Sequence, residues 1–246
     1  MEKRPMAHGL MSSMILSLAL AIGLARKISI FVPLVLINGI IDIYAFNYLR
    51  LKVTKLNLKD LILLVILFIP YIIMLKLNNF YLIMPISLLI LYLIFSFKKK
   101  FVLSNIIGST FIASLSLIWL LMISNINVEQ FLIILSWIIF TLTLSVIVEY
   151  KLPFRKIDKV STIGYPLIII SLGIAITYLL GYYDLILLYT FPISALILSG
   201  EKLRNVKEIK KIGKIGMYSS LSFILIGIML YNLFLTPINL NIIFIN

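Results

Sequence analysis

Residues 102–124 read VLSNIIGSTFIASLSLIWLLMIS, and this stretch decides the fold. It contains no charged side chain, and Lys98, Lys99 and Lys100 lie just before it. A helix of about 20 apolar residues is long enough to cross the hydrocarbon core of a bilayer, which is about 30 Å thick. The stretch therefore predicts a transmembrane helix that begins beside a cluster of lysines.

The composition of the whole chain agrees with that prediction. Of its 246 residues, 62% are hydrophobic and only 13% are charged, whereas soluble domains have about 45–50% apolar and about 25% charged residues. A water-soluble fold of this size cannot bury so much apolar surface. The composition excludes a soluble enzyme, a disordered protein, a coiled coil and a collagen-like chain.

Eight further apolar runs flank the first, and charged or polar residues separate most of them. The nine runs cover residues 7–25, 28–49, 60–75, 80–97, 102–124, 131–150, 164–183, 184–200 and 215–235. They predict an all-α, polytopic transmembrane helical bundle of about nine spans that forms a single integral membrane domain over residues 1–246. The apolar tail, 237–246, is too short to span and is expected at the membrane interface.

The basic residues indicate the orientation of the bundle. The chain has 22 lysine and arginine residues against 9 aspartate and glutamate residues, a net charge of +13. With a cytoplasmic N-terminus, 19 of the 22 fall in the inner segments, which are 1–6, 50–59, 98–101, 151–163 and 201–214. Cytoplasmic loops carry such an excess, so we predict a cell-membrane protein whose C-terminus lies outside.

These basic segments also suggest partners. They are expected to contact anionic lipid headgroups at the bilayer surface, and no nucleic-acid partner is expected. The segment 201–214 is interpreted as an ordinary loop, with an interfacial amphipathic helix as the alternative.

The chain lacks the residues that most intramembrane chemistry needs. It has no cysteine and a single histidine, so disulfides, thiolate metal sites and a haem held by two of its own histidines are excluded. We find no Walker A motif and no HExxH motif. The sequence therefore predicts no catalytic residue, no metal site and no cofactor, and a protein that is not an enzyme.

The clearest candidate for a functional side chain is Asp42. It lies about 10 Å from the inner end of its span at 1.5 Å per residue, and an acid at that depth is a functional candidate. Asn38 lies one turn earlier on the same helix face. His8 lies on the same side of the membrane and either contacts Asp42 or meets lipid headgroups. A structural role for Asp42 as a hydrogen-bonded pin between helices is the alternative.

Four more polar residues lie at the inner ends of spans. Glu149 and Glu201 close the sixth and eighth spans, and Ser219 and Ser220 open the ninth. Small polar residues of this kind commonly hold transmembrane helices together. If they form a site instead, that site opens toward the cytoplasm.

The N-terminal segment contains a short motif, Pro5-Met6-Ala7-His8-Gly9. It resembles the Pro-x-x-His-Gly signature of the YwiC-like membrane proteins. The stretches LINGIIDIYAFNYLRLK (36–52) and KIGKIGMYSSLSFILIGI (211–228) are similar to stretches in that family. The resemblance implies a polytopic membrane architecture and draws attention to His8 and Gly9, and it implies no activity.

Two functions fit these observations. The scarcity of buried polar groups favours a hydrophobic partner or anchoring subunit that binds other membrane subunits, with a respiratory electron-transport complex as one candidate. The alternative is a transporter of a small solute or an ion, with a cytoplasm-facing polar site around Asp42.

The charge distribution yields a direct test of orientation. Because the chain has no native cysteine, single cysteines at positions 158 and 207 can be labelled without background. We expect an impermeant thiol reagent to label both from the cytoplasmic side only. Labelling of either position in intact cells would overturn the predicted orientation.

Overall fold

The computed structural model describes residues 8–25, 31–49, 57–74, 80–203, 205 and 208–235, and the structural statements below concern these residues. Every regular element within them is a helix. The α-helices are α1 (His8–Leu24), α2 (Phe31–Leu49), α3 (Leu58–Met74), α4 (Ile83–Phe97), α5 (Phe101–Ile123), α6 (Val128–Lys151), α7 (Lys159–Leu179), α8 (Thr190–Ile197) and α9 (Ile209–Met229).

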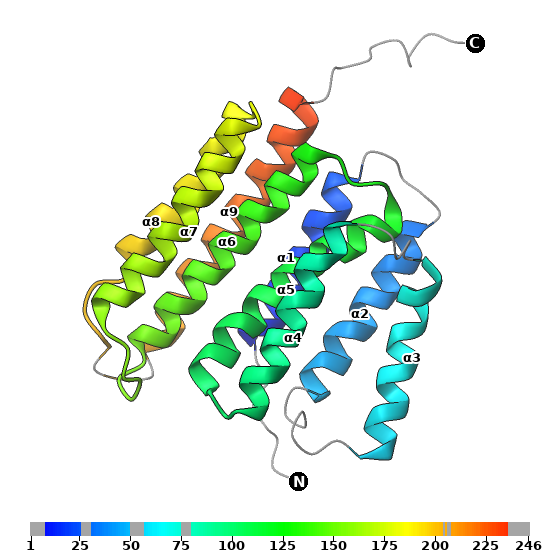
Figure 1. Ribbon diagram of the computed structural model, residues 1–246, viewed down its shortest axis with the longest axis horizontal. Coiled ribbons are helices and arrows are strands. Elements are labelled where there is room, and N and C mark those ends of the chain that lie inside the picture. Colours follow the sequence, from blue (N-terminus) through cyan, green and yellow to red (C-terminus); the bar gives the residue numbers. More distant parts are fainter. Residues whose placement is uncertain are drawn as a thin grey trace.

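Three short helical segments extend these α-helices. The 3₁₀ turn η1 (Phe80–Leu82) leads into α4, and the 3₁₀ helix η2 (Tyr183–Tyr189) leads into α8. The π-helical turn η4 (Leu230–Leu235) continues α9. The long helices run side by side and successive ones alternate in direction, which gives one elongated bundle (Figure 1).

Helices α5 and α6 form the centre of the bundle. Within their most apolar 18-residue windows, 72% and 61% of the residues are buried, against 28% in α7. Helix α1 packs against α5, and α9 packs against both α1 and α6. The largest buried side chains include Trp119 on α5, Trp137 and Phe140 on α6, and Phe223 on α9. The core thus consists of the helices that have protein neighbours on most of their sides.

Within the described part of the chain, five helices are long and apolar enough to cross a membrane. They cover Phe80–Phe97, Phe101–Ile123, Val128–Lys151, Lys159–Leu179 and Ile209–Leu233, and shorter apolar helices cover Met11–Leu24, Phe31–Phe46 and Tyr183–Ile197. The all-helical fold predicted from the sequence is confirmed, and the apolar helices support a membrane protein.

Two expected boundaries differ from the structure. The run 184–200 is not one α-helix, because it starts as η2 and becomes α-helical only at Thr190. Pro192 stands in the first turn of α8, where its missing N–H leaves no helical hydrogen bond unmade. Residues 209–214, expected in a loop, form the start of α9, and Ile212 is buried there. The tail 237–246 lies outside the described residues.

The helix ends carry recognisable capping interactions. Asn127 and Gln130 form a reciprocal capping box at the start of α6. Asp158 caps α7 by accepting the backbone N–H of Ser161 at 2.7 Å, and this hydrogen bond lowers the pKa of the Asp158 carboxyl below its ordinary value. After α7, Gly181 adopts a φ of +81°, a left-handed conformation that glycine tolerates best. These interactions fix the starts of α6 and α7 and the turn after α7.

Most described basic residues lie at one end of the bundle. The connections α4–α5, α6–α7 and α8–α9 all lie there (Figure 1). We call it the basic end, and its residues are Lys98, Lys99, Lys100, Lys151, Arg155, Lys156, Lys159, Lys202, Lys210 and Lys211.

Candidate functional site

A cavity of about 700 Å³ lies among the helices near the basic end. Its walls come from α1, α2, α4, α5, α6 and α9. The α5 wall runs from Phe101 to Ile112, which is about 16 Å of helix at 1.5 Å per residue. This length is roughly half the thickness of a hydrocarbon core, which is about 30 Å. Its polar lining residues are Ser12, Ser13, Tyr92, Ser96, Ser104, Asn105, Ser109, Thr141, Ser145, Glu149 and Ser220.

Serine hydroxyls of this lining donate hydrogen bonds to backbone carbonyls of their own helices. Ser12 and Ser13 both donate to the carbonyl of Gly9, at 2.9 and 3.0 Å. Ser109 donates to the carbonyl of Asn105, and Ser145 to that of Thr141. A hydroxyl has one proton and two acceptor lone pairs, so each of these oxygens keeps accepting capacity. The wall consequently presents more hydrogen-bond acceptors than donors.

Glu149 is the one acidic residue among the described residues that line the cavity. It lies near the end of α6 and its side chain is 7% exposed. One carboxylate oxygen, Oε1, accepts a 2.7 Å hydrogen bond from Asn105 on α5. The other, Oε2, lies 2.9 Å from Nε of Arg155. This carboxylate therefore joins two helices and the α6–α7 connection.

The ion pair with Arg155 is close but poorly aligned. Glu149 Oε2 and Arg155 Nε are both buried, and neither has a hydrogen-bond partner among the described residues. Hydrogen bonds weaken steeply as the donor N–H turns away from the acceptor. The pair thus gains charge attraction at 2.9 Å without the directed hydrogen bond that this distance permits.

The connections around Arg155 hold one another in place. Lys202 donates to the carbonyl of Arg155 at 2.6 Å and lies 5.4 Å from the centre of the Tyr150 ring. Lys151 donates to the backbone carbonyl of Glu201. These contacts join the α6–α7 and α8–α9 connections beside the cavity.

Asp42 belongs to a separate polar cluster. Its Oδ2 accepts a hydrogen bond from Asn38 at 3.3 Å, as their spacing on α2 predicts, and another from the Tyr71 hydroxyl on α3. The indole N–H of Trp119 on α5 donates to the Tyr71 oxygen at 3.2 Å. Asp42 and Asn38 are buried, at 9% and 5% exposure. The cluster links α2, α3 and α5, and Asp42 is not among the cavity-lining residues.

The structure brings together only some of the residues singled out in the sequence. Glu149 and Ser220 line the cavity, whereas Ser219 and Glu201 do not, and Glu201 is exposed beside α8. The His8 side chain lies outside the described residues, although its backbone begins α1. Sequence reasoning missed Tyr71 and Arg155, which are an aromatic residue and a loop cation with no distinctive local pattern.

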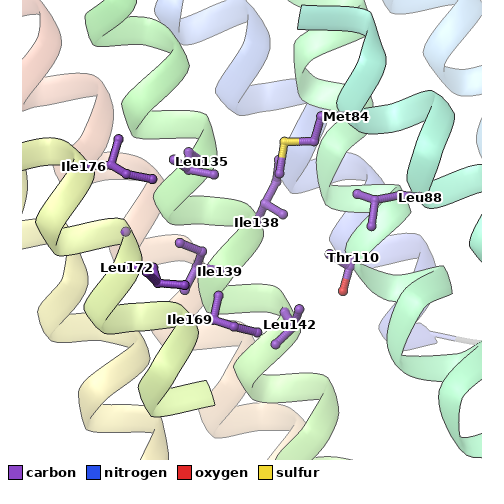
Figure 2. A pocket seen from close by; sticks show the side chains of 11 residues that line it. Met84, Leu88, Thr110, Leu135, Ile138, Ile139, Leu142, Ile169, Leu172 and Ile176 are labelled. Atoms are coloured by element: carbon purple, nitrogen blue, oxygen red, sulfur yellow. The ribbon is translucent and has the colours of Figure 1, made fainter. Parts of the chain in front are cut away.

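A second, smaller cavity is apolar. It encloses about 230 Å³ between α4 and α5 on one side and α6 and α7 on the other (Figure 2). Its only hydroxyl belongs to Thr110 and is already donated to the carbonyl of Ile106 at 2.8 Å. Apart from the Thr110 oxygen, this lining offers no polar side chain to orient a ligand, so it is not the candidate site.

No described group of three or more His, Asp or Glu side chains has the arrangement needed to hold a metal ion. No family model matches the chain, and no curated protein or solved structure shows significant similarity to it. Function is therefore inferred from the cavity and from Asp42 and Glu149, two of the three buried acids among the described residues.

The Asp42 cluster predicts different outcomes for two substitutions. In Asp42→Asn, one amide oxygen can still accept from both Asn38 and Tyr71, so thermal stability in detergent should stay near that of the wild type. Asp42→Leu leaves both donors without their acceptor and should destabilise the protein by about 1–3 kcal/mol. Thermal unfolding of the two variants measures the difference, and a fully stable Asp42→Leu protein would show that the cluster is not structural.

Proposed function

We propose that the protein is a nine-span cell-membrane protein that binds a small polar solute in the cytoplasm-facing cavity and transports it. The single observation that carries this proposal is the cavity of about 700 Å³ with its polar lining. Ionisable residues within transmembrane segments commonly mark substrate or ion pathways, and Glu149 lines this space. The nine spans follow from the nine apolar runs, and the orientation follows from the positive-inside rule.

The proposed binding site is not the polar site around Asp42 that the sequence suggests. Asp42 lies in the α2–α3–α5 cluster, where hydrogen bonds from Asn38 and Tyr71 occupy it. Glu149, by contrast, lines the cavity near the basic end. We therefore assign solute binding to the cavity around Glu149, Asn105 and the nearby hydroxyls, and a structural role to Asp42.

The partner-subunit hypothesis remains the second candidate. It rests on the broad exposed apolar faces of the outer helices, for example Ile168, Leu172 and Ile176 on α7. Lipid chains cover such faces as well as protein does. A stoichiometric membrane partner that co-purifies with the chain would support this second function.

Access to the cavity can be measured with cysteine substitutions. We expect Ser145→Cys, which lines the cavity, to react with a small charged thiol reagent added from the cytoplasmic side of membrane vesicles. Ser136→Cys is the matched control, because Ser136 lies on the same helix, is 0% exposed and does not line the cavity. If the cysteine at position 145 reacts as slowly with the reagent as the one at position 136, the cavity is not aqueous.

Transport itself can be tested with a variant that plugs the cavity. A Cβ at Gly213, which lines the cavity, or at Gly164 on α7 would meet no atom within 4 Å. We expect proteoliposomes to take up labelled glycerol, urea or methylammonium faster than protein-free liposomes do. Gly213→Phe should return uptake to the protein-free rate, whereas Gly164→Phe should not change it.

Absence of uptake for all three probes would count against transport. If the chain also co-purified with a stoichiometric membrane partner, the subunit function would replace the proposed one.

A further inference from the structure

The cavity contains one feature that indicates the chemistry of its ligand. Its described lining includes one carboxylate, Glu149, and no lysine or arginine, although the chain carries a net charge of +13. The oxygens of four lining serines, Ser12, Ser13, Ser109 and Ser145, keep accepting lone pairs, because their protons go to backbone carbonyls. A wall of acceptors around a single carboxylate suits a ligand that brings donors and a positive charge.

The Glu149 carboxylate is also incompletely bonded. Asn105 satisfies Oε1 with a hydrogen bond of 2.7 Å. Oε2 is buried and has no hydrogen-bond donor among the described residues, although Arg155 Nε lies 2.9 Å away. A buried acceptor without its hydrogen bond is unfavourable. A donor that approaches Oε2 from the cavity can make the directed bond that Arg155 does not make.

Arg155 can leave this position more easily than Glu149 can. Its side chain is 23% exposed against 7% for that of Glu149, and it belongs to the α6–α7 connection rather than to a helix. The Phe154 ring, 5.2 Å from the guanidinium carbon, offers it a second favourable contact. The guanidinium of Arg155 therefore lies at the Glu149 carboxylate in the position that a bound cation would take.

We propose that Glu149 is the recognition site for a small organic cation of the ammonium or guanidinium class, which binds in the cavity and displaces Arg155 from the carboxylate. This inference rests on the proposed solute-binding function and names its substrate class. Arg155 and the solute compete for one carboxylate. Apparent affinity is proportional to the fraction of protein in which the site is not blocked. Weakening the contact between Arg155 and Glu149 should therefore strengthen solute binding.

The test compares methylguanidinium with N-methylurea, its neutral isostere, on the purified full-length protein by calorimetry at constant ionic strength. We expect the wild type to bind methylguanidinium and to bind N-methylurea much more weakly. Arg155→Gln should tighten methylguanidinium binding by about tenfold, since it removes the competing group. Arg155→Lys keeps the charge but loses the planar fork. Its affinity for methylguanidinium should lie between those of the wild type and Arg155→Gln.

Matched variants separate this competition from general effects of charge. Lys156→Gln removes a positive charge from the same connection, and Lys156 is exposed, so it should leave affinity unchanged. Glu149→Gln should abolish binding even when combined with Arg155→Gln, a double variant in which neither charge is left alone. Glu201→Gln, which removes an exposed carboxylate outside the cavity lining, should bind as the wild type does.

Three outcomes would overturn the proposal. These are equal binding of N-methylurea and methylguanidinium, no tightening in both Arg155→Gln and Arg155→Lys, and binding that survives Glu149→Gln. Failure of the broader function looks different, because then Gly213→Phe would not alter uptake of any solute. Uptake of neutral glycerol or urea that Gly213→Phe blocks, without a preference for cations, would leave transport in place and remove only the Glu149 assignment.

Discussion

The bundle depends on polar side chains of α6 that bind neighbouring helices at several depths. In hydrocarbon, helices gain little by burying apolar surface against one another, so packing and hydrogen bonds must hold them together. Gln130 donates to the Leu24 carbonyl at 2.7 Å, Trp137 donates to Ser17 at 3.0 Å, and Glu149 accepts from Asn105. The first two contacts bind α1 to α6, and the third binds α5. Helix α6 is thereby fixed along most of its length, and the cavity wall that it forms is fixed with it.

The cavity exists because small side chains face one another where the helices diverge. Gly9, Gly108, Gly213 and Gly216 line it together with seven serines. A Cβ at Gly9 or Gly213 would touch nothing, whereas one at Gly23 would lie 2.2 Å from Cδ1 of Ile228. The same residue type therefore allows close contact between α1 and α9 at Gly23 and leaves open space at Gly213. The distance between the backbones decides which outcome occurs, not the small residue itself.

This dependence on backbone distance explains what the sequence could and could not reveal. Apolar length and clustered lysines predict the helices and most of their limits, because both are local properties of the chain. The serines near the start of α5 were readable as polar residues at the inner end of a span. Their role as a cavity wall could not be predicted, because serines also occur where transmembrane helices pack closely together. The link between Asp42 and Tyr71, 29 residues apart, has no local pattern, and neither has the bond between Asn105 and Glu149 across 44 residues.

A comparison of Asp42 with Glu149 shows why one buried acid suits a structural role and the other suits a ligand. Burying a carboxylate is unfavourable unless hydrogen bonds and charge offset the lost hydration. At Asp42, side chains from α2 and α3 both donate to one oxygen, and Trp119 in turn orients the Tyr71 hydroxyl. At Glu149, one oxygen is hydrogen-bonded, and the other has only the nearby charge of Arg155 among the described residues. A ligand that competes at Asp42 must replace two directed hydrogen bonds, whereas one at Glu149 exchanges a poorly aligned ion pair for a directed hydrogen bond. The cost of displacing the protein's own partner is therefore smaller at Glu149 than at Asp42.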